Sequence, residues 1–298
     1  VRVQVRNAGM TNSRWYSGSG IYRDVYMLTS CGTYIEPDMV QVKTETVEGG
    51  FAVLGVETTV INENFGSAKY YLTTSIKDAE GNETGAEKTA FFVKAGESKT
   101  LHQSIMVKAP RLWDEDDPYL YTVESTLCDG RECIDTACDT FGIRVLALDA
   151  ARGFRVNGKA VNLRGACIHH DSGMLGAATY EEAHIRQAEI LKEAGFNAIR
   201  MSHHPAAPAL LRACDKLGLY VMDEFSDMWL RTKNDLDYAL DFDTNWEKDV
   251  ELMVRKDFNH PSVVLYSVGN EIPEIGTNAG SNLCAKIADV FKTKDPSR

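Results

Sequence analysis

The sequence predicts a β-sandwich followed by an α/β region that contains a parallel sheet. Over residues 1–145, apolar and polar residues alternate as in half-buried strands, whereas after about residue 150 short apolar runs alternate with helical patterns. A chain of 298 residues also suggests two domains, at roughly 150 residues per domain. Hydrophobic residues make up 44% and charged residues 25%, which is the composition of a globular chain.

The first region is interpreted as an immunoglobulin-like sandwich over residues 34–145. Within residues 51–61, Leu54, Val56 and Val60 fall on one face of a strand. Residues 78–82 form a turn between two such runs. Several short strands at regular spacing are typical of this fold. The expected strands are residues 40–47, 51–61, 70–76, 89–94, 101–107, 119–127 and 132–141.

The second region repeats a strand followed by a helix. The expected strands are residues 160–167, 197–201, 219–222 and 263–268, and the helices follow them at 182–194, 208–217, around 246–254 and at 282–291. Thr179 and Glu182 have the spacing of a capping box at the start of the first helix. Gly195 and Gly218 are expected to end the first two helices. This alternation predicts parallel strands joined by crossover helices.

Polar side chains follow every strand of the second region. They are His169, His170 and Asp171 after the first, Arg200, His203 and His204 at and after the second, Asp223 and Glu224 after the third, and Asn270 and Glu271 after the fourth. In parallel α/β folds, the carboxyl ends of the strands meet at one face, where ligands bind. The sequence therefore predicts an active site at this face.

Glu271 is the candidate general acid/base. It follows an apolar strand, so we expect partial burial to raise the pKa of its carboxyl group. Asn270 beside it can hydrogen-bond to a polyol, although the pair could also be a strand end with a helix-capping Asn. Trp229, in the loop after the third strand, offers an aromatic face for a sugar ring.

The histidines allow two interpretations. His169, His170, His203 and His204 could bind a metal ion together with Asp171 and Glu224. Adjacent residues of a strand point to opposite sides, which disfavours a metal site. Neutral histidines that contact sugar hydroxyls are therefore the favoured interpretation. Arg200 could orient a carboxylate, or it could form an ion pair with Asp223 or Glu224.

Charge and cysteine content exclude several classes of partner. Forty-three acidic and 32 basic residues give a net charge of -11, which disfavours binding to nucleic acid or anionic lipid. No apolar stretch reaches the ~18 residues of a membrane helix. Cys128, Cys133 and Cys138 are five residues apart, a spacing that matches no zinc site. We therefore expect no nucleic acid, membrane, metal or cofactor among the partners.

Several motifs closely resemble those of the family-2 glycoside hydrolases, and of β-galactosidases in particular. They are Asn197-Ala-Ile-Arg-Met-Ser-His-His-Pro205, Cys214-Asp-Lys-Leu-Gly-Leu219, Asn259-His-Pro-Ser-Val-Val-Leu-Tyr-Ser-Val-Gly-Asn-Glu271, Leu163-Arg-Gly-Ala-Cys-Ile-His-His-Asp171, and Arg14-Trp-Tyr-x-Gly-x-Gly-Ile-Tyr-Arg23. The resemblance implies the tail of a jelly-roll domain over residues 1–33, an immunoglobulin-like sandwich over 34–145, and the first (β/α)4 half of a TIM-type (β/α)8 barrel over 146–298.

The resemblance also implies a bacterial exo-β-glycosidase that retains stereochemistry by using two carboxyl groups about 5–5.5 Å apart. Glu271 matches the general acid/base, and Asn270 matches the residue that contacts the sugar 2-hydroxyl. His203 and His169 match sugar-contacting histidines, and Arg200 matches an arginine that supports the nucleophile. A β-galactoside is the expected substrate; a β-glucuronide, or carbohydrate binding without catalysis, is the alternative.

Departures from the family pattern shape three further expectations. The family's nucleophile lies on the seventh barrel strand, so we expect no turnover from this chain alone and self-association through an incomplete barrel. Some β-galactosidases bind magnesium with a Glu and a His where this chain has Asp227 and Trp229, so no metal is expected. Tyr266 replaces a usual Trp. The compartment, bacterial cytoplasm or periplasm, stays open.

Overall fold

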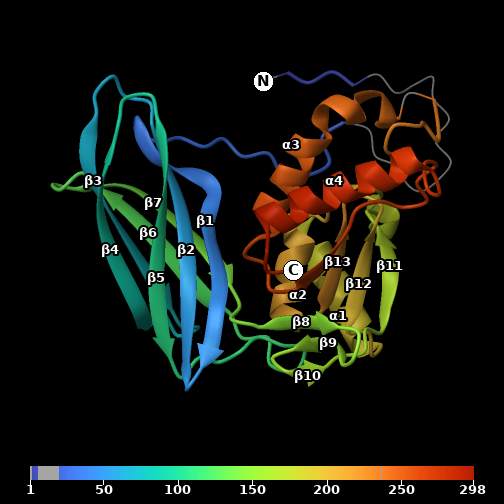
Figure 1. Ribbon diagram of the computed structural model, residues 1–298, viewed down its shortest axis with the longest axis horizontal. Helices are drawn as coiled ribbons and strands as arrows, with labels where there is room; N and C mark the ends of the chain where they lie inside the picture. Colours follow the sequence, from blue (N-terminus) through green and yellow to red (C-terminus); the bar gives the residue numbers. More distant parts are fainter. Residues whose placement is uncertain (1, 6–19, 236) are drawn as a thin grey trace. The chain divides into compact units, whose positions relative to one another are not determined.

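A computed structural model describes residues 2–5, 20–235 and 237–298 as two compact units. The sandwich unit contains residues 27–161 together with residues 258–261. The parallel-sheet unit contains the described part of residues 1–26, residues 162–257 and residues 262–298. Figure 1 shows the elements of both units.

Seven strands of the sandwich unit form two antiparallel sheets, which confirms the seven strands expected from the sequence. One sheet has the order β1 (Thr33–Glu48), β2 (Phe51–Asn62), β5 (Ser98–Lys108). The other has the order β4 (Glu83–Val93), β3 (Ala68–Lys77), β6 (Tyr121–Cys128), β7 (Cys133–Phe141).

Apolar side chains from both sheets form the core of the sandwich. Strand β6 alternates between buried and half-buried positions along its whole length, because successive side chains of a strand point to opposite faces. Leu54 from one sheet and Leu72, Ile76 and Val123 from the other are essentially inaccessible to solvent. Complete burial of such a side chain stabilises the fold by about 1.5–3 kcal/mol.

We expected the apolar run at residues 160–167 to form one strand, but its residues belong to two different strands. A small antiparallel sheet contains β8 (Leu146–Asp149), β9 (Gly153–Val156) and β10 (Lys159–Ala160), and β11 begins only at Gly165. Asn197 provides the physical reason. Its side chain donates to the carbonyl of Asn162 at 3.0 Å and accepts from the amide of Arg164 at 2.6 Å, so the intervening backbone bonds to a side chain instead of a strand.

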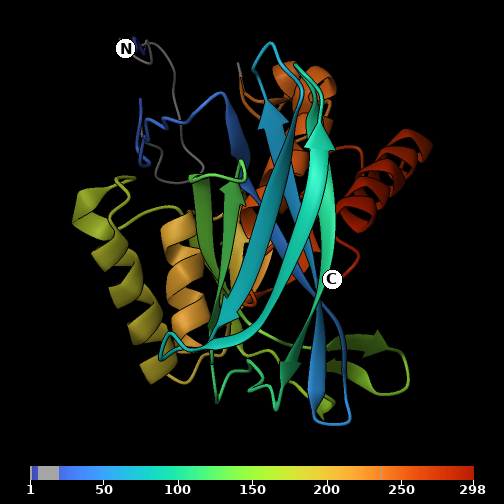
Figure 2. The same cartoon turned by 90° about the vertical axis from the view of Figure 1, so that its left-hand side faces the viewer.

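The parallel-sheet unit confirms the repeated strand–helix pattern. Its sheet has the order β11 (Gly165–His169), β12 (Ala198–Ser202), β13 (Tyr220–Glu224), β14 (Val263–Ser267). The connections contain η1 (Gly173–Leu175), α1 (Glu181–Glu193), α2 (Pro208–Leu217) and α3 (Ala239–Asp257), and α4 (Asn278–Lys294) follows β14. Helices α1 and α2 pack side by side (Figure 2). This is the arrangement of the first half of a (β/α)8 barrel.

The helix ends agree with the sequence in one case and differ in another. Helix α2 ends as expected at Gly218, whose φ of 70° is left-handed and whose amide donates to the carbonyl of Cys214. Helix α1, in contrast, is capped by Tyr180 without a side-chain hydrogen bond. The hydroxyl of Thr179 lies 2.7 Å from Nε2 of His170 instead, so the predicted capping box does not form.

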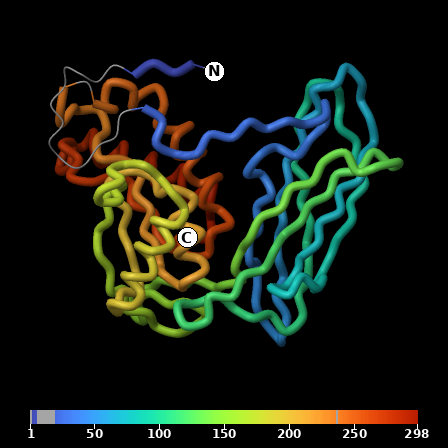
Figure 3. The backbone as a smooth tube through the Cα atoms, turned by 180° about the vertical axis from the view of Figure 1, so that it is seen from behind, coloured from blue at the N-terminus to red at the C-terminus, as the bar shows by residue number. Residues whose placement is uncertain are grey.

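The described N-terminal residues form neither helix nor strand up to residue 32. Figure 3 traces their backbone. Two hydrogen bonds attach them to the parallel-sheet unit: Arg23 Nη2 donates to the carbonyl of Pro205 at 2.6 Å, and the amide of Thr179 donates to the carbonyl of Tyr22 at 3.1 Å. The motif residues 14–19 lie outside the described residues. Within the described part of the chain, no helix combines the length and apolarity needed to cross a membrane.

Candidate active site

A fully buried carboxylate connects the ends of β12, β13 and β14. Glu224, the last residue of β13, is 0% exposed. Its Oε2 accepts hydrogen bonds from Arg200 Nε at 3.0 Å, Arg200 Nη2 at 2.5 Å and Ser267 Oγ at 2.6 Å, and its Oε1 lies 2.6 Å from His203 Nδ1. The carboxylate thus has the partners that a buried charge requires. Because these contacts occupy both of its oxygens, Glu224 is suited to fixing the positions of Arg200, His203 and Ser267 rather than to reacting with a substrate.

Arg200 is the cationic partner in this cluster. Burial lowers the pKa of its guanidinium, but the hydrogen bond and the charge of Glu224 outweigh burial, and the pKa is raised overall. Planar guanidinium groups match carboxylates geometrically. The ion pair with Glu224 that the sequence allowed is therefore present, and the guanidinium also extends to Asn270.

Asn270 is held at both ends of its amide. Its Oδ1 accepts from Arg200 Nη2 at 3.1 Å, and its Nδ2 donates to Asp227 Oδ1 at 2.8 Å. Its backbone amide donates to the carbonyl of Ser226 at 3.0 Å. Rotating the amide by half a turn would bring its NH2 group against a guanidinium and its oxygen against a carboxylate. Charge therefore fixes this orientation, in which one N–H of Nδ2 is given to Asp227.

Glu271 lies in the turn beyond β14. Its φ of 45° is left-handed, a conformation that costs a residue other than Gly about 1–2 kcal/mol. The side chain is exposed, which corrects our expectation of partial burial. The reason is its place in the chain: β14 ends at Ser267, so Glu271 comes after the buried part of the strand.

The adjacent residues His169 and His170 point in different directions, as strand geometry predicted. The rings of His169 and His203 lie 5.1 Å apart in an edge-to-face arrangement. If Nδ1 of His203 carries the proton that faces Glu224, its Nε2 is an acceptor. His170 points elsewhere and packs 5.6 Å from His204 and 5.1 Å from Tyr22. The strand ends thus bring His169 and His203 together.

Asp171 and Trp229 are less directly connected to this cluster. Asp171 is exposed and lines a cavity of about 650 Å³ beside α1. Trp229 is only 3% exposed, and its indole N–H donates to the carbonyl of Val268 at 3.1 Å. A Cβ atom at Gly269 would lie 3.1 Å from the indole nitrogen. Trp229 therefore packs closely on the backbone that leads to Asn270, and the exposed ring face that we expected is absent.

A second ionic cluster, which we did not predict, lies behind the strand ends. Lys256 Nζ donates to Asp223 Oδ2 at 3.1 Å and also contacts Asp257. Asp223 Oδ1 accepts from the amide of Ala206 at 2.9 Å, which fixes the loop after β12. Burial raises the pKa of Asp257 to about 7, although the charge of Lys256 opposes the shift. The sequence signal was weak, since Lys256 and Asp257 simply end a helical pattern.

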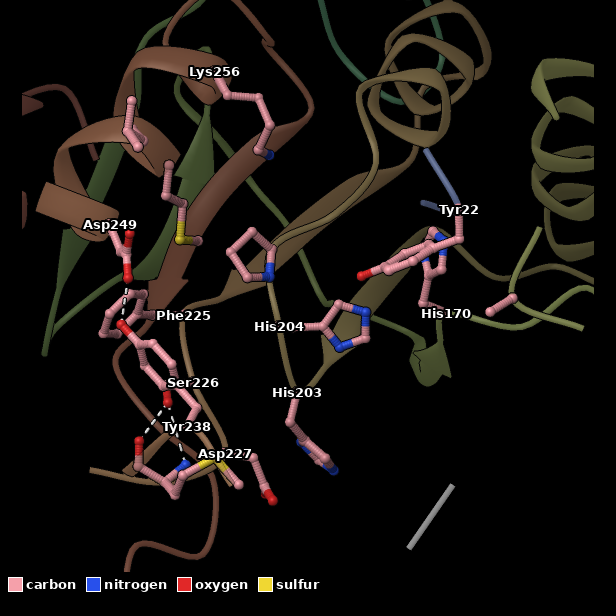
Figure 4. Close-up of a pocket in the computed structure, with 15 residues that line it drawn as sticks. Tyr22, His170, His203, His204, Phe225, Ser226, Asp227, Tyr238, Asp249 and Lys256 are labelled. Atoms are coloured by element: carbon pink, nitrogen blue, oxygen red, sulfur yellow. Dashed lines mark hydrogen bonds between the residues drawn. The ribbon is translucent and has the colours of Figure 1, made fainter. Parts of the chain in front are cut away.

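A cavity of about 550 Å³ adjoins both clusters (Figure 4). Its aromatic lining consists of Tyr22, Phe225 and Tyr238, while Asp227 and His203 link it to the strand-end residues. Burial, followed by the hydrogen bond to Asp249, raises the pKa of Tyr238. Apolar walls with a few polar groups are typical of small-molecule sites.

Two histidines of this cavity are strongly shifted toward their neutral form. Burial, followed by the charge of Arg23, lowers the pKa of His170 to about 3 and that of His204 to about 4. Both rings are therefore uncharged at neutral pH. Neutral imidazoles can donate and accept hydrogen bonds to hydroxyl groups.

The described residues do not fit a metal ion at the strand ends. No group of three or more His, Cys, Asp or Glu side chains within residues 2–5, 20–235 and 237–298 is arranged to hold one. At the positions where some β-galactosidases bind magnesium, Asp227 Oδ1 already accepts from Lys233 Nζ at 2.9 Å. The indole of Trp229 donates to a carbonyl and offers no ligand atom.

Comparison with protein families agrees with this geometry. The family model "Glycosyl hydrolases family 2, TIM barrel domain" matches residues 148–298, and the model "Glycosyl hydrolases family 2" matches residues 33–144. The chain belongs to glycosyl hydrolase family 2. Its two units are thus the sandwich and part of the TIM barrel of this family.

Relatives within family 2 cover the chain almost completely. A β-galactosidase of Bacteroides ovatus is 42% identical over 93% of the chain and 32% of its own length. A putative β-glucuronidase of Formosa agariphila is 32% identical over 100% of the chain and 27% of its own length. The crystal structure of a family-2 member from Bacteroides cellulosilyticus has a TM-score of 0.93 at 39% identity, over 96% of this chain and 37% of that one. The chain thus spans about a third of the length of these relatives.

Proposed function

We propose that this chain is part of a retaining exo-β-glycosidase that hydrolyses terminal, non-reducing β-D-galactosides, with Glu271 as the general acid/base. The observation that carries the proposal is the fixed Asn270–Glu271 pair, in which Arg200 and Asp227 hold the amide beside an accessible carboxyl group. The 42% identical relative named a β-galactosidase supports the choice of sugar.

Glu271 would act twice in the double displacement. In the first step, its carboxylic acid protonates the glycosidic oxygen while a carboxylate nucleophile attacks the anomeric carbon and the aglycone departs. In the second step, the carboxylate of Glu271 takes a proton from water, which displaces the nucleophile. We propose that the nucleophile lies outside residues 1–298, since the relatives are about three times as long as the matched region.

The neighbouring side chains would bind the sugar. The second N–H of Asn270 would donate to the 2-hydroxyl, and the edge-to-face pair His169 and His203 would contact other hydroxyl groups. Asp171 and Trp229 stay predicted substrate contacts. Their positions suggest that Asp171 acts from the rim, and that Trp229 acts through the backbone on which it packs.

A β-glucuronide is the second candidate substrate, because a relative that covers the whole chain is named a putative β-glucuronidase. A glucuronate carboxylate requires a nearby cation. Three cations of the described site already face protein carboxylates: Arg200 faces Glu224, Lys233 faces Asp227, and Lys256 faces Asp223, whereas Arg23 donates to the carbonyl of Pro205. This arrangement favours a neutral sugar.

The test is an assay of a polypeptide that carries these residues within a complete barrel. We expect 4-nitrophenyl β-galactoside to be hydrolysed much faster than the corresponding glucuronide, with or without chelator. Glu271→Ala should reduce kcat by roughly 10²–10⁴-fold, and azide, which needs no general base, should restore turnover by forming a β-glycosyl azide. The exposed Glu193→Ala serves as a matched control. Full activity in Glu271→Ala would refute the assignment of the acid/base, and turnover of the glucuronide alone would transfer the proposal to that sugar.

We also propose that residues 1–298 alone are inactive and self-associate. Within the described residues, β11 pairs only with β12 and β14 only with β13, so one edge of each is unpaired. Unpaired edges favour pairing between chains. Sedimentation of the isolated chain should show dimers or larger species that dissociate on dilution. A purely monomeric chain, or one with turnover sensitive to Glu271→Ala, would contradict this proposal.

A further inference from the structure

Lys233 places a buried cation between the loops that follow β13 and β14. Its Nζ donates to Asp227 Oδ1 at 2.9 Å and to the carbonyl of Asn270 at 2.8 Å. The side chains of Lys233 and Asp227 are only 13% and 3% exposed. A buried ammonium group requires anionic or carbonyl partners, and this one has both.

The carbonyl that Lys233 binds belongs to the peptide group linking Asn270 to Glu271. The other fixed points of this turn are the Asn270 amide, which donates to Ser226, and the Asn270 side chain, which donates to Asp227. Glu271 itself has a left-handed backbone, a conformation that persists only where the surroundings impose it. Lys233 provides one of the contacts that impose it.

We propose that Lys233 is a positioning residue, whose ammonium group fixes the Asn270–Glu271 peptide and takes the place of a divalent cation at this site. The disagreement between the residues and a magnesium site supports this inference, since the ammonium occupies Asp227 and Trp229 supplies no ligand. The catalytic consequence of this inference rests on the proposed function, whereas the contacts of Lys233 with Asp227 and Asn270 are independent of it.

The catalytic consequence depends on the leaving group. A misplaced general acid slows departure of an aglycone that needs protonation, whereas a dinitrophenyl group departs without it. Lys233→Met keeps most of the length of the aliphatic side chain and removes the positive charge of the ammonium group. We expect it to reduce kcat/KM for phenyl β-galactoside, which reports on the first step, by about 10- to 100-fold, with a much smaller loss of kcat/KM for 2,4-dinitrophenyl β-galactoside. Lys233→Arg should recover part of the loss.

A second measurement does not depend on turnover. Amide hydrogen exchange of residues 268–274 should become about tenfold faster in Lys233→Met, while the exposed Lys248→Met should leave it unchanged. Wild-type activity should respond neither to chelator nor to added magnesium. The experiment uses the same complete-barrel polypeptide as the assay above.

The outcomes separate the two proposals. If the wild type hydrolyses no β-glycoside but exchange accelerates in Lys233→Met, the proposed function fails and the positioning role stands. If exchange is unchanged, or if kcat/KM falls equally for both leaving groups while the wild type is active, the positioning role is wrong. A wild-type enzyme that loses activity on chelation would overturn the replacement of a divalent cation.

Discussion

The two units bury their polar groups in opposite ways. Among the described residues, every buried carboxylate lies in the parallel-sheet unit: Asp215, Asp223, Glu224, Asp227, Asp257, Glu274 and Asp295. The sandwich buries mainly hydroxyl and amide groups, such as the Thr74–Ser125 pair, whose oxygens are 2.8 Å apart. Burial of a charge costs more free energy than burial of a neutral polar group. The buried carboxylates therefore lower the stability of the parallel-sheet unit, which is the unit that holds the candidate active site.

One position in each unit shows why the two residue types are not interchangeable. Glu224 accepts hydrogen bonds from Arg200 and Ser267 and faces no acceptor among them. Gln103 in β5 uses Nε2 to donate to the carbonyls of Leu72 and Glu87, at 3.4 and 3.2 Å, and to the hydroxyl of Thr89 at 3.0 Å. A cluster of donors requires a carboxylate, whereas a cluster of acceptors requires an amide. Exchanging the two residue types therefore tests the comparison directly.

The largest expected effect is that of Glu224→Gln. The amide would present an N–H to Arg200, Ser267 or His203, all of which donate to this position, and would leave the guanidinium without its charged partner. We expect kcat/KM of the complete enzyme to fall by about 100-fold. We also expect the free energy of unfolding to fall by about 3 kcal/mol. Steady-state kinetics and urea unfolding measure the two effects.

The exposed Glu247→Gln on α3 is the control for this change. If Glu224→Gln retained wild-type activity, the strand-end cluster would be structural only, and the contrast between the units would lose its functional meaning.

The reciprocal exchange, Gln103→Glu, should affect stability without affecting chemistry. Its carboxylate would face two backbone carbonyls that cannot donate, in a site that is 4% exposed. We expect the sandwich to lose about 3 kcal/mol of stability, while Gln103→Met, which removes the donor without adding charge, should lose about 1–2 kcal/mol. Urea unfolding of the three proteins would rank them. Equal losses of stability in Gln103→Glu and Gln103→Met would show that the charge of the introduced carboxylate does not determine the loss.

Much of the fold follows from hydrophobic periodicity. The seven sandwich strands and the four strand–helix repeats are visible in the sequence because each element has one buried face. The strand-end group of Arg200, His203, Glu224 and Asn270 is also predictable, since parallel strands bring their carboxyl ends to one place.

The errors arise where loops determine the contact. Lys233 comes from an irregular segment with no periodic pattern, so nothing local indicates that it reaches the carbonyl of Asn270. Thr179 has the correct spacing for a cap, but His170 competes for its hydroxyl. The burial of Trp229 and the exposure of Glu271 likewise depend on how the chain turns after each strand. Tertiary proximity, not residue type, decides all four cases.

Acid should distinguish the two units. His170 and His204 have pKa values near 3 and 4, below the ordinary value of 6.5, because of burial and then Arg23. The unfolded chain therefore binds protons below about pH 6.5 that the folded unit does not bind. The two histidines should therefore lower the stability of the parallel-sheet unit as the pH drops from about 6.5 toward 4, against the opposite contribution of Asp257, whose pKa is raised to about 7, and they should have no effect at higher pH. The one histidine of β5, His102, is exposed.

Thermal unfolding from pH 7.5 to 4.5 measures this effect. His170→Gln, which keeps a polar atom near Thr179 but does not titrate, should flatten the pH dependence of Tm. The same slope in the wild type and this variant would assign the effect to other groups.

The smallest expected effect concerns cysteine chemistry in the sandwich. The Sγ atoms of Cys128 and Cys133 lie 2.8 Å apart, and the two residues are directly paired between β6 and β7. The amide of Asp129 donates to the carbonyl of Glu132 in the next pair, so the cysteines occupy a non-hydrogen-bonded position, where side chains approach most closely. Cys214 of α2, in contrast, is buried, and burial raises the pKa of its thiol.

Oxidised glutathione should therefore cross-link the hairpin and leave Cys214 untouched. The thiolate of Cys133 attacks the glutathione disulfide and releases one glutathione thiolate. The thiolate of Cys128 then attacks Sγ of Cys133, forms the protein disulfide and releases the second. Mass spectrometry should show the loss of two hydrogens in the peptide that contains both residues, and closure of this short loop should raise stability by up to about 2 kcal/mol. Cys138→Ser should behave like the wild type, because Cys138 lies opposite Glu124; if that variant blocked the cross-link, the hairpin pairing would not be the cause.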